Sequence, residues 1–418
     1  MKTTSRKRAI GRHRPTLRPA LRYAALLMAA GAIAACSSEK GDVSPGNIEG
    51  NGMGILFKAE EIPGSASRAT VTTTATIRKV GVFGYGYTGD FATNKATMLP
   101  DYFFNQAVAD LPGNGTWTYS GVTKYWPTNG NNMSFFAYAP YIDVENTFTL
   151  YPAAKTDAGV PKITYTVPAS MLDQIDLLYA NWLDKKVTDT PSGGGQVPLS
   201  MNHAMTKIDF QVMLDDGRVD PVNSPTGEQG RPFIVKFDTL SFQNLVGGGT
   251  LDLSTGIWTP VRSDINPATT PLANYDLIPT GHGGMNTLLN NPGFDARNAP
   301  AAAGTVNPWA FNSLLKTGQY LMLRPQVLTD LSDGYPAQVE IKYCVTNVFS
   351  GQTTYFSKVI ALAPALAEWT PGLSVTYQLI FTLIPKMEIE LDVATFNAIT
   401  AQPWDNMNST NPITGQVR

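Results

Sequence analysis

The chain has 418 residues, of which 15% are charged, and a formal net charge of −2. The first 35 residues hold eight of the 31 basic residues and no acidic one, so the rest of the chain carries 23 basic against 33 acidic residues, a net charge of −10. This charge excludes binding to nucleic acid through a basic surface. A modestly acidic surface is suited to solubility outside a cell.

The N-terminal segment has the layout of a bacterial lipoprotein signal. Residues 1–22 are basic, and residues 23–35 form an uninterrupted run of 13 apolar or small residues that ends with Ala34 and Ala35, directly before Cys36. A basic region, a short apolar core and small residues at the cut are typical of a secretory signal. A run of this length is too short for a spanning helix, which needs roughly 20 residues. An uncleaved anchor and a buried core helix are the alternatives.

We therefore expect residues 1–35 to be a signal peptide that is removed, with lipid attached to Cys36 of the precursor. Residues 36–52 are polar and rich in turn formers, which predicts a tether between the lipid and the fold. The expected location is the outer membrane, reached through the lipid anchor. The second cysteine, Cys344, then has no disulfide partner within the chain and is predicted to be a buried, inert core thiol.

The first strand is predicted at residues 53–62. Ile55, Phe57 and Ala59 share one face, and Lys58 and Glu60 lie on the other, which is typical of a strand with one buried face. Small residues follow over 63–70, and they predict a flexible loop.

Short apolar-alternating runs between turn residues continue along the chain, which predicts an all-β protein of the sandwich type. In the first half we expect strands at 71–86, 102–110 and 133–140, a hairpin over 116–127, and a helical turn within 170–180. In the second half we expect strands at 199–212, 233–245 and 249–258, more strands from 321 and 339, and a final hairpin of 373–384 with 387–393. Residues 259–315 lack a regular pattern and predict a long loop or an inserted element.

The glycine-rich segment 189–197 is the predicted domain boundary. About 380 residues after the signal are more than one hydrophobic core usually supports, so two domains are expected. The N-terminal domain is predicted over 53–197 and the C-terminal domain over 198–418.

The sequence offers no motif for catalysis. It lacks a phosphate-binding glycine loop, a metal-spaced His/Cys pair and a nucleophile elbow. Asp215, Asp216 and Asp220 lack the glycine spacing of a calcium loop and predict a turn instead. His203 lies in an alternating strand, where a packed or hydrogen-bonded histidine is expected. We predict a protein that is not an enzyme, with no catalytic residue, no cofactor and no metal.

Five segments, in order, resemble the fimbrillins, the family of major and minor fimbrial subunits and Mfa-like lipoproteins of the Bacteroidia. They are the lipobox with strand 54–59 and Arg68–Ala69, the runs Trp126–Pro127 and Ser134–Pro140, Asp176–Ala180, Leu199–Val212, and a closure with Trp369, Pro371–Gly372, strand 373–384 and Trp404. Each motif alone is weak, but their order is specific and covers nearly the whole chain after the signal.

This resemblance implies two transthyretin-like β-sandwich domains in tandem, each with Greek-key topology. It also implies a structural subunit of a cell-surface fimbrium that is exported as a lipoprotein precursor. In that family an extracellular trypsin-like protease cuts after a basic residue that follows the first strand, which here is the bond between Arg68 and Ala69. The strand with Ile55, Leu56 and Phe57 then leaves, and a strand of the next subunit fills the groove.

The implied partners are other fimbrial subunits, the protease and the outer membrane, with a host protein or a glycan as a further partner class. Arg78 and Lys79 are rival basic sites within an expected strand. Residues 405–418 hold few large apolar residues, so either the 387–393 region rearranges as donor, or this subunit accepts a donor without giving one and is a tip or accessory subunit. The alternative is a monomeric lipid-anchored adhesin that binds a glycan or a protein through 259–315.

Overall fold

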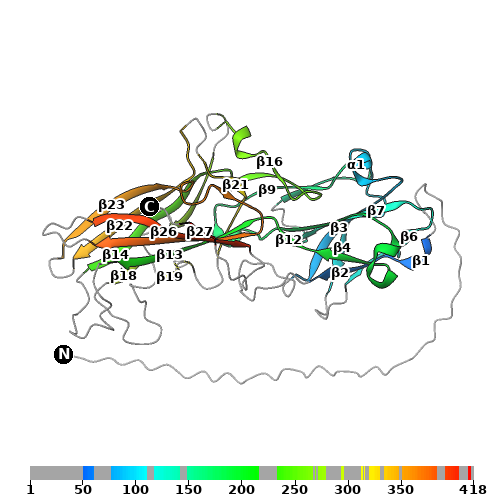
Figure 1. Cartoon of the computed structure of the whole chain (residues 1–418), viewed down its shortest axis with the longest axis horizontal. Coiled ribbons are helices and arrows are strands. Elements are labelled where there is room, and N and C mark those ends of the chain that lie inside the picture. Colours follow the sequence, from blue (N-terminus) through cyan, green and yellow to red (C-terminus); the bar gives the residue numbers. More distant parts are fainter. Residues whose placement is uncertain are drawn as a thin grey trace, which may run out of the picture. The chain divides into compact units, whose positions relative to one another are not determined.

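The computed structural model consists almost entirely of β-strands (Figure 1), which confirms the predicted all-β class. It describes residues 50–60, 77–110, 117–141, 148–215, 233–266, 269, 272–278, 293–295, 312–313, 315, 320–329, 334–347, 351–383, 391–403 and 413–415. In this part of the chain the single α-helix is α1 (Phe91–Asn94), and no helix is long and apolar enough to cross a membrane. Cys36, Arg68 and Ala69 lie outside the described residues.

A six-stranded antiparallel sheet organises the first half of the chain. Its strands follow the order β12 (Asn202–His203), β10 (Leu178–Lys185), β7 (Asn132–Ala139), β3 (Lys79–Tyr87), β4 (Phe103–Ala109) and β5 (Thr118–Tyr119). The two middle strands are covered on both faces, which explains their nearly continuous apolar sequences. In β7, Met133 and Phe135 belong to one core cluster, and Phe136 and Tyr138 to the other. The sheet therefore separates two hydrophobic cores.

Two further sheets form a β-sandwich in the second half. One follows the order β19 (Asn312–Ser313), β13 (Thr206–Asp215), β25 (Leu373–Leu383), β26 (Leu391–Pro403) and β27 (Ile413–Gly415), with β20 (Leu321–Leu323) also on β13. The other follows β17 (Ala273–Ile278), β14 (Phe233–Leu245), β22 (Gln338–Asn347) and β23 (Thr353–Ala361), with β18 (Gly293–Asp295) also on β14. The rings of Phe210 and Tyr377 from the first sheet lie 6.1 and 5.8 Å from that of Phe242 in the second, so side chains of both sheets share one core.

A smaller sheet joins segments from both sides of the predicted domain boundary. Its order is β16 (Trp258–Thr259), β15 (Gly248–Asp252), β9 (Lys162–Thr166) and β8 (Phe148–Tyr151). Ile163 and Leu251 in this sheet belong to the same core cluster as Tyr138 and Tyr377. The predicted boundary at residue 197 also falls inside β11 (Gln196–Ser200). The division into two domains stays a prediction.

The hairpin predicted over 116–127 is wrong. β5 pairs with β4, whereas β6 (Tyr125–Pro127) pairs with β1 (Gly50–Gly54). Turn residues mark where the chain reverses, but packing against distant strands decides which partner each arm takes. Part of the expected loop over 259–315 is also structured, because β17 places Tyr275 and Leu277 in the core, each 2% exposed.

Short 3₁₀ turns account for most of the remaining regular structure. η1 (Met171–Asp173) confirms the helical turn expected within 170–180. The other turns are η2 (Val187–Asp189), η3 (Pro191–Gly193) and η4 (Arg262–Asp264). Cys344 lies in β22 and is free of a disulfide, but its side chain is half-buried, so the expectation of a fully buried thiol is wrong.

Candidate functional site

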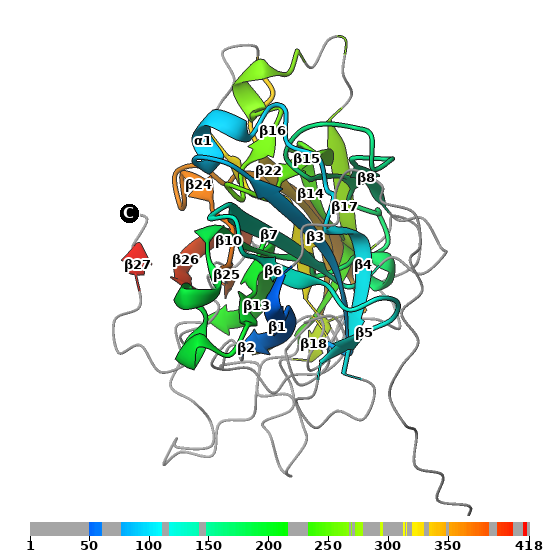
Figure 2. The ribbon, with the colours of Figure 1, turned by 90° about the vertical axis from the view of Figure 1, so that its right-hand side faces the viewer.

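The segment predicted to leave on assembly forms two short strands with different partners (Figure 2). β1 pairs antiparallel with β6, and β2 (Leu56–Glu60) pairs in parallel with β11, from the pair Leu56–Gln196 to the pair Glu60–Ser200. The change of partner falls at Ile55. Parallel pairs are slightly less stable per residue than antiparallel ones, and each of the two strands is only five residues long. Short ladders therefore join this segment to the fold.

Alternate side chains of the segment are buried. Ile55 and Phe57 are 0% and 2% exposed, whereas Leu56 is 50% exposed. Successive side chains of a strand point to opposite faces, so Leu56 must face away from the core when its neighbours face it. Leu56, named with Ile55 and Phe57 in the strand expected to leave, therefore does not share their burial. Ile55 and Phe57 remain as buried anchors, and the burial of each side chain stabilises the fold by about 1.5–3 kcal/mol.

Aromatic side chains surround the Phe57 anchor. The Phe57 ring meets Phe103, Tyr119 and Phe135 edge-on, with ring centres 5.2, 5.9 and 5.9 Å away. Trp126 is fully buried beside them, and its indole N–H donates to the Gly195 carbonyl at 3.0 Å. Edge-on aromatic pairs add about 0.5–1.5 kcal/mol beyond their buried area. We call these residues the strand seat: Phe103, Tyr119, Trp126, Phe135 and Gly195.

Hydrogen bonds at the change of partner fix the register of the segment. The Ile55 N–H donates to the Lys124 carbonyl at 2.8 Å, and the Leu56 N–H donates to the Gly195 carbonyl at 3.1 Å. The Tyr119 hydroxyl donates to the Ile55 carbonyl at 3.1 Å and accepts from the Lys124 N–H at 3.1 Å. Burial raises the pKa of Tyr119 above its ordinary value, while the hydrogen bond from Lys124 opposes this. The hydroxyl therefore stays protonated, as a donor must, at neutral pH.

Gly195 allows β1 to approach the seat closely. Its φ is +73°, and an added Cβ would lie 2.4 Å from the Gly54 carbonyl oxygen and 2.8 Å from Cγ of Met53. Only glycine fits both the left-handed backbone and this contact. Gly193 also has a positive φ, +64°, but an added Cβ would meet nothing within 4 Å. The glycines that the sequence marks as a boundary therefore include one with a specific role in holding β1.

Neither partner strand of this segment has a second ladder in the described sheets. In the described sheets β11 pairs with β2 alone, and β6 with β1 alone. Val197 and Leu199 of β11 are buried in the same core cluster as Phe57. Without β1 and β2, both partners would present unpaired backbone groups beside an apolar groove, which is the arrangement that strand addition uses. Sequence reasoning missed β11, although the alternation of Val197, Leu199 and Met201 was a signal for it.

Cys36, Arg68 and Ala69 lie outside the described residues, so lipid attachment and cutting stay predictions. The rival basic sites are described. Lys79 opens β3 and pairs with Ala109, and the Arg78 carbonyl accepts a hydrogen bond from the Asp110 N–H at 3.0 Å. Their backbone is therefore engaged in the central sheet, as expected.

His203 forms the hydrogen bond expected of a packed histidine. Its Nδ1 lies 2.9 Å from Oδ1 of Asp176, and the two side chains are 5% and 0% exposed. Lys207 is buried nearby; burial lowers the pKa of its amine, and the charges of Asp176 and Asp209 oppose this. Packing and hydrogen bonding in the core account for the positions of His203, Asp176 and Lys207. Among the described residues, no three His, Cys, Asp or Glu side chains are placed to hold a metal ion.

The strands described above define an all-β protein with a β-sandwich and an N-terminal strand held by short ladders. The sequence model of the family described as fimbrillin-like matches residues 67–404, which is more than half of the chain. The chain therefore belongs to the fimbrillin-like family, and the resemblance noted from its motifs is confirmed.

Among curated proteins, the chain is similar to the fimbrium subunit Fim1C of Phocaeicola vulgatus, with 26% identity over 195 residues. That alignment covers 44% of this chain and 48% of Fim1C, so the chain spans about half the length of this relative. Similar solved structures include a candidate cell adhesion protein from Bacteroides uniformis (16% identity, 84% of this chain and 98% of that chain covered, TM-score 0.42) and a fimbrilin from Porphyromonas gingivalis (10% identity, 84% and 96% covered, TM-score 0.40). Both TM-scores lie below 0.5, so the family assignment rests on the sequence model.

Proposed function

We propose that this chain is a structural subunit of a cell-surface fimbrium. Its precursor carries lipid on Cys36 and is held at the outer membrane. A trypsin-like extracellular protease cuts between Arg68 and Ala69, and the β1–β2 segment leaves the strand seat. A strand of a neighbouring subunit takes its place, and the cut frees the folded body from its own anchor. Adhesion is then a property of the assembled filament.

The way in which the first strand is held is the observation that carries this proposal. Ile55 and Phe57 together contribute about 3–6 kcal/mol by burial, and the ladders on either side are short. A donor strand with two apolar residues at alternate positions could supply equivalent contacts. Membership of the fimbrillin-like family supports the same assembly, and so does the similarity to Fim1C, a fimbrium subunit.

Two alternatives exist for the donor strand. β26 lies between β25 and β27 in its sheet. A donor that includes the start of β26 would have to break the pairs of Leu391 and Asp392 with β25, whereas β27 is joined to β26 by three residue pairs. Both alternatives are therefore kept: a rearranged 387–393 region that gives a strand, or an acceptor that gives none and sits at the tip or in an accessory position.

Limited proteolysis of the purified precursor tests the proposal. We expect trypsin to produce a ladder of oligomers that survives detergent without boiling, with Ala69 as the new N-terminus. The Arg68→Gln variant should stay monomeric, and the Arg78→Gln variant should form the same ladder as the parent. A precursor that is cut at Arg68 but remains a monomer would overturn strand exchange and favour the monomeric adhesin.

A further inference from the structure

A cavity of about 200 Å³ lies far from the strand seat in the sequence, where three segments of the second half meet. They are residues 256–262 around β16, the strand β21 (Gln326–Val327) with the residues before it, and β24 (Glu368–Trp369) with Pro371 after it. β21 and β24 pair with each other as a separate two-stranded ribbon. The proposed assembly uses none of these residues.

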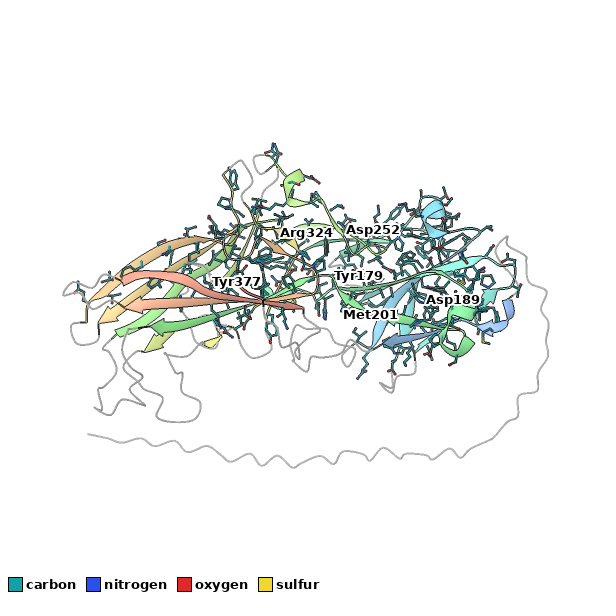
Figure 3. All side chains as sticks on the ribbon, viewed as in Figure 1. Tyr179, Asp189, Met201, Asp252, Arg324 and Tyr377 are labelled. Atoms are coloured by element: carbon teal, nitrogen blue, oxygen red, sulfur yellow. The ribbon has the colours of Figure 1, made fainter. Side chains whose placement is uncertain are left out.

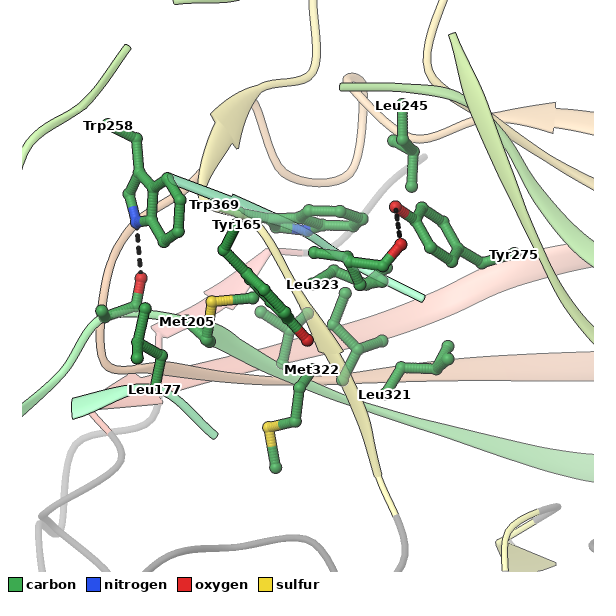
Figure 4. Packing of buried hydrophobic residues seen from close by; sticks show 14 of the residues in the cluster. Tyr165, Leu177, Met205, Leu245, Trp258, Tyr275, Leu321, Met322, Leu323 and Trp369 are labelled. Atoms are coloured by element: carbon green, nitrogen blue, oxygen red, sulfur yellow. Dashed lines mark hydrogen bonds between the residues drawn. The ribbon is translucent and has the colours of Figure 1, made fainter. Parts of the chain in front are cut away.

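Two tryptophans line the cavity, and the indole N–H group of each already donates a hydrogen bond within the fold. The Trp258 indole N–H donates to the Ala204 carbonyl at 2.8 Å (Figure 4), and the Trp369 N–H donates to the Tyr377 hydroxyl at 2.9 Å. Trp369 is fully buried, and Trp258 is 5% exposed. Of the two rings, that of Trp258 therefore has an exposed part that a molecule in the cavity can contact, and neither indole offers a donor.

Apolar side chains line the mouth of the cavity. Ile257, Val261 and Val327 are 57%, 44% and 42% exposed, although each is a branched aliphatic residue. The exposure of one such side chain is ordinary, but three around one cavity mark an interaction surface.

A buried positive charge completes the lining. Arg324 (Figure 3) is 2% exposed, its guanidinium lies 5.7 Å from the Trp258 ring centre, and it donates to the carbonyls of Gly248 and Pro260. Its Nε has no hydrogen-bond partner among the described residues. Burial lowers the pKa of Arg324 to about 10. The charge is thus held by neutral oxygens, without an ion pair to a carboxylate in the described part of the chain.

A second arginine adds to this charge. Arg262 is also 2% exposed, and it donates to the Asn244 and Tyr335 carbonyls and to Oε1 of Gln326. The Gln326 amide is itself used, since it accepts from the Val246 N–H at 2.8 Å and donates to the Arg324 carbonyl at 3.1 Å. The one acidic residue in the lining is Glu368, whose side chain is exposed.

We propose that this cavity binds a partner peptide that presents a carboxylate beside an apolar side chain. Charge complementarity selects the carboxylate, because a buried cation attracts an anion far more strongly than an exposed one does. The aliphatic mouth and the exposed part of the Trp258 ring select the apolar side chain. A sugar fits less well, because its hydroxyl groups need polar partners, and those of Gln326 and of both tryptophans are already taken.

Small probes test this proposal on the purified full-length protein. Binding of N-acetyl-leucine, N-acetyl-leucinamide and N-acetylneuraminic acid is measured by saturation-transfer NMR and calorimetry. We expect the N-acetyl-leucine acid to bind with a Kd on the order of 1 mM, about tenfold more tightly than its neutral amide. High salt should reduce this difference, since it depends on charge.

Three variants assign the binding to this cavity. Ile257→Asp should weaken binding of the acid about tenfold by placing a like charge at the mouth. Val359→Asp is the matched control, because Val359 is 51% exposed on β23, and it should leave binding unchanged. Glu368→Gln should strengthen binding of the acid and leave binding of the amide unchanged, and the circular dichroism spectrum of each variant confirms its fold.

Several outcomes would overturn the proposal. These are equal affinity for acid and amide, no saturable binding of either at about 20 mM, tighter binding of N-acetylneuraminic acid than of N-acetyl-leucine, or Ile257→Asp and Val359→Asp variants that behave alike. None of these depends on strand exchange, so failure here is distinct from failure of the proposed assembly.

Discussion

The first strand and the inner strand β13 are both β-structure, yet the fold holds them in different ways. β13 pairs with β25 over nine consecutive residue pairs and carries β20 and β19 on its other edge. β2 pairs with β11 over five residue pairs, and on its other edge the described residues give it a single bridge, from Phe57 to Trp117. The sequences of both segments favour strands. Under the proposed assembly, ladder length and the number of buried anchors, rather than β-propensity, therefore distinguish the strand that leaves from the strand that stays.

The largest expected effect is a difference in stability between variants of a buried anchor, Phe57, and of its exposed neighbour, Leu56. Phe57→Ala should lower the free energy of unfolding of the precursor by about 3–5 kcal/mol, because it empties a buried aromatic site. Leu56→Ala, at a side chain that is 50% exposed, should cost less than about 1 kcal/mol. Urea unfolding measures both. Equal losses in the two variants would mean that the first strand is not held as described.

A substitution in the permanent region should act on every form of the protein. Asp176→Ala removes the buried partner of His203 and should cost about 3 kcal/mol. The loss should be the same in the precursor and in protein assembled after the cut, because neither residue belongs to the exchanged strand. A loss confined to the precursor would place this pair in the exchange step and break the comparison.

Variants of Gly193 and Gly195 distinguish the effect of backbone strain from the effect of a lost contact with β1. Gly195→Ala and Gly193→Ala both force alanine into a left-handed backbone, which costs about 1–2 kcal/mol. Only the first also drives a Cβ against the Gly54 carbonyl. We expect faster amide hydrogen exchange in residues 50–60 for Gly195→Ala alone. Matching exchange in both variants would remove Gly195 from the strand seat.

The smallest expected effect is pH-dependent. Tyr119→Phe should weaken the hold on β1 and β2 by about 1 kcal/mol, through the lost hydrogen bond to Ile55. The pKa of Tyr119 is raised in the folded state from 10.0, so its contribution is complete below pH 10 and is lost as pH rises above that value. Hydrogen exchange of residues 50–60 should therefore accelerate above pH 10 more in the parent than in Tyr119→Phe. Parallel pH profiles would contradict this role.

The positions of several strands could be predicted from the sequence, because they depend on a local period of two. The pairing of strands could not, because it depends on partners that lie far away in the chain. Alternation in β3, β7 and β25 was enough to find those strands, because a period of two is a property of the strand itself. The hairpin predicted over 116–127 failed because its arms find other neighbours. The partners of the first strand lie about 70 and 140 residues away in the chain, and no local pattern specifies them.

The same limit applies to the candidate sites. The alternation around Ile55 and Phe57 predicted the buried anchors, and a stricter use of the period would have excluded Leu56. The tryptophan cavity could not be predicted, because Trp258, Arg324 and Trp369 come together only when three distant segments fold. Buried arginines held by carbonyl oxygens leave no sequence signature.

A reversible lock on the first strand tests the central claim most directly. Leu56 and Gln196 are register partners in the β2–β11 pair, and neighbouring strands bring Cα atoms within the range that a disulfide spans. The Leu56→Cys, Gln196→Cys double variant is oxidised, cut with trypsin and run without boiling, with each single variant as a control. We expect the oxidised protein to stay monomeric and to form the ladder after reduction. A ladder from the fully oxidised, cut protein would show that assembly does not require this strand to leave.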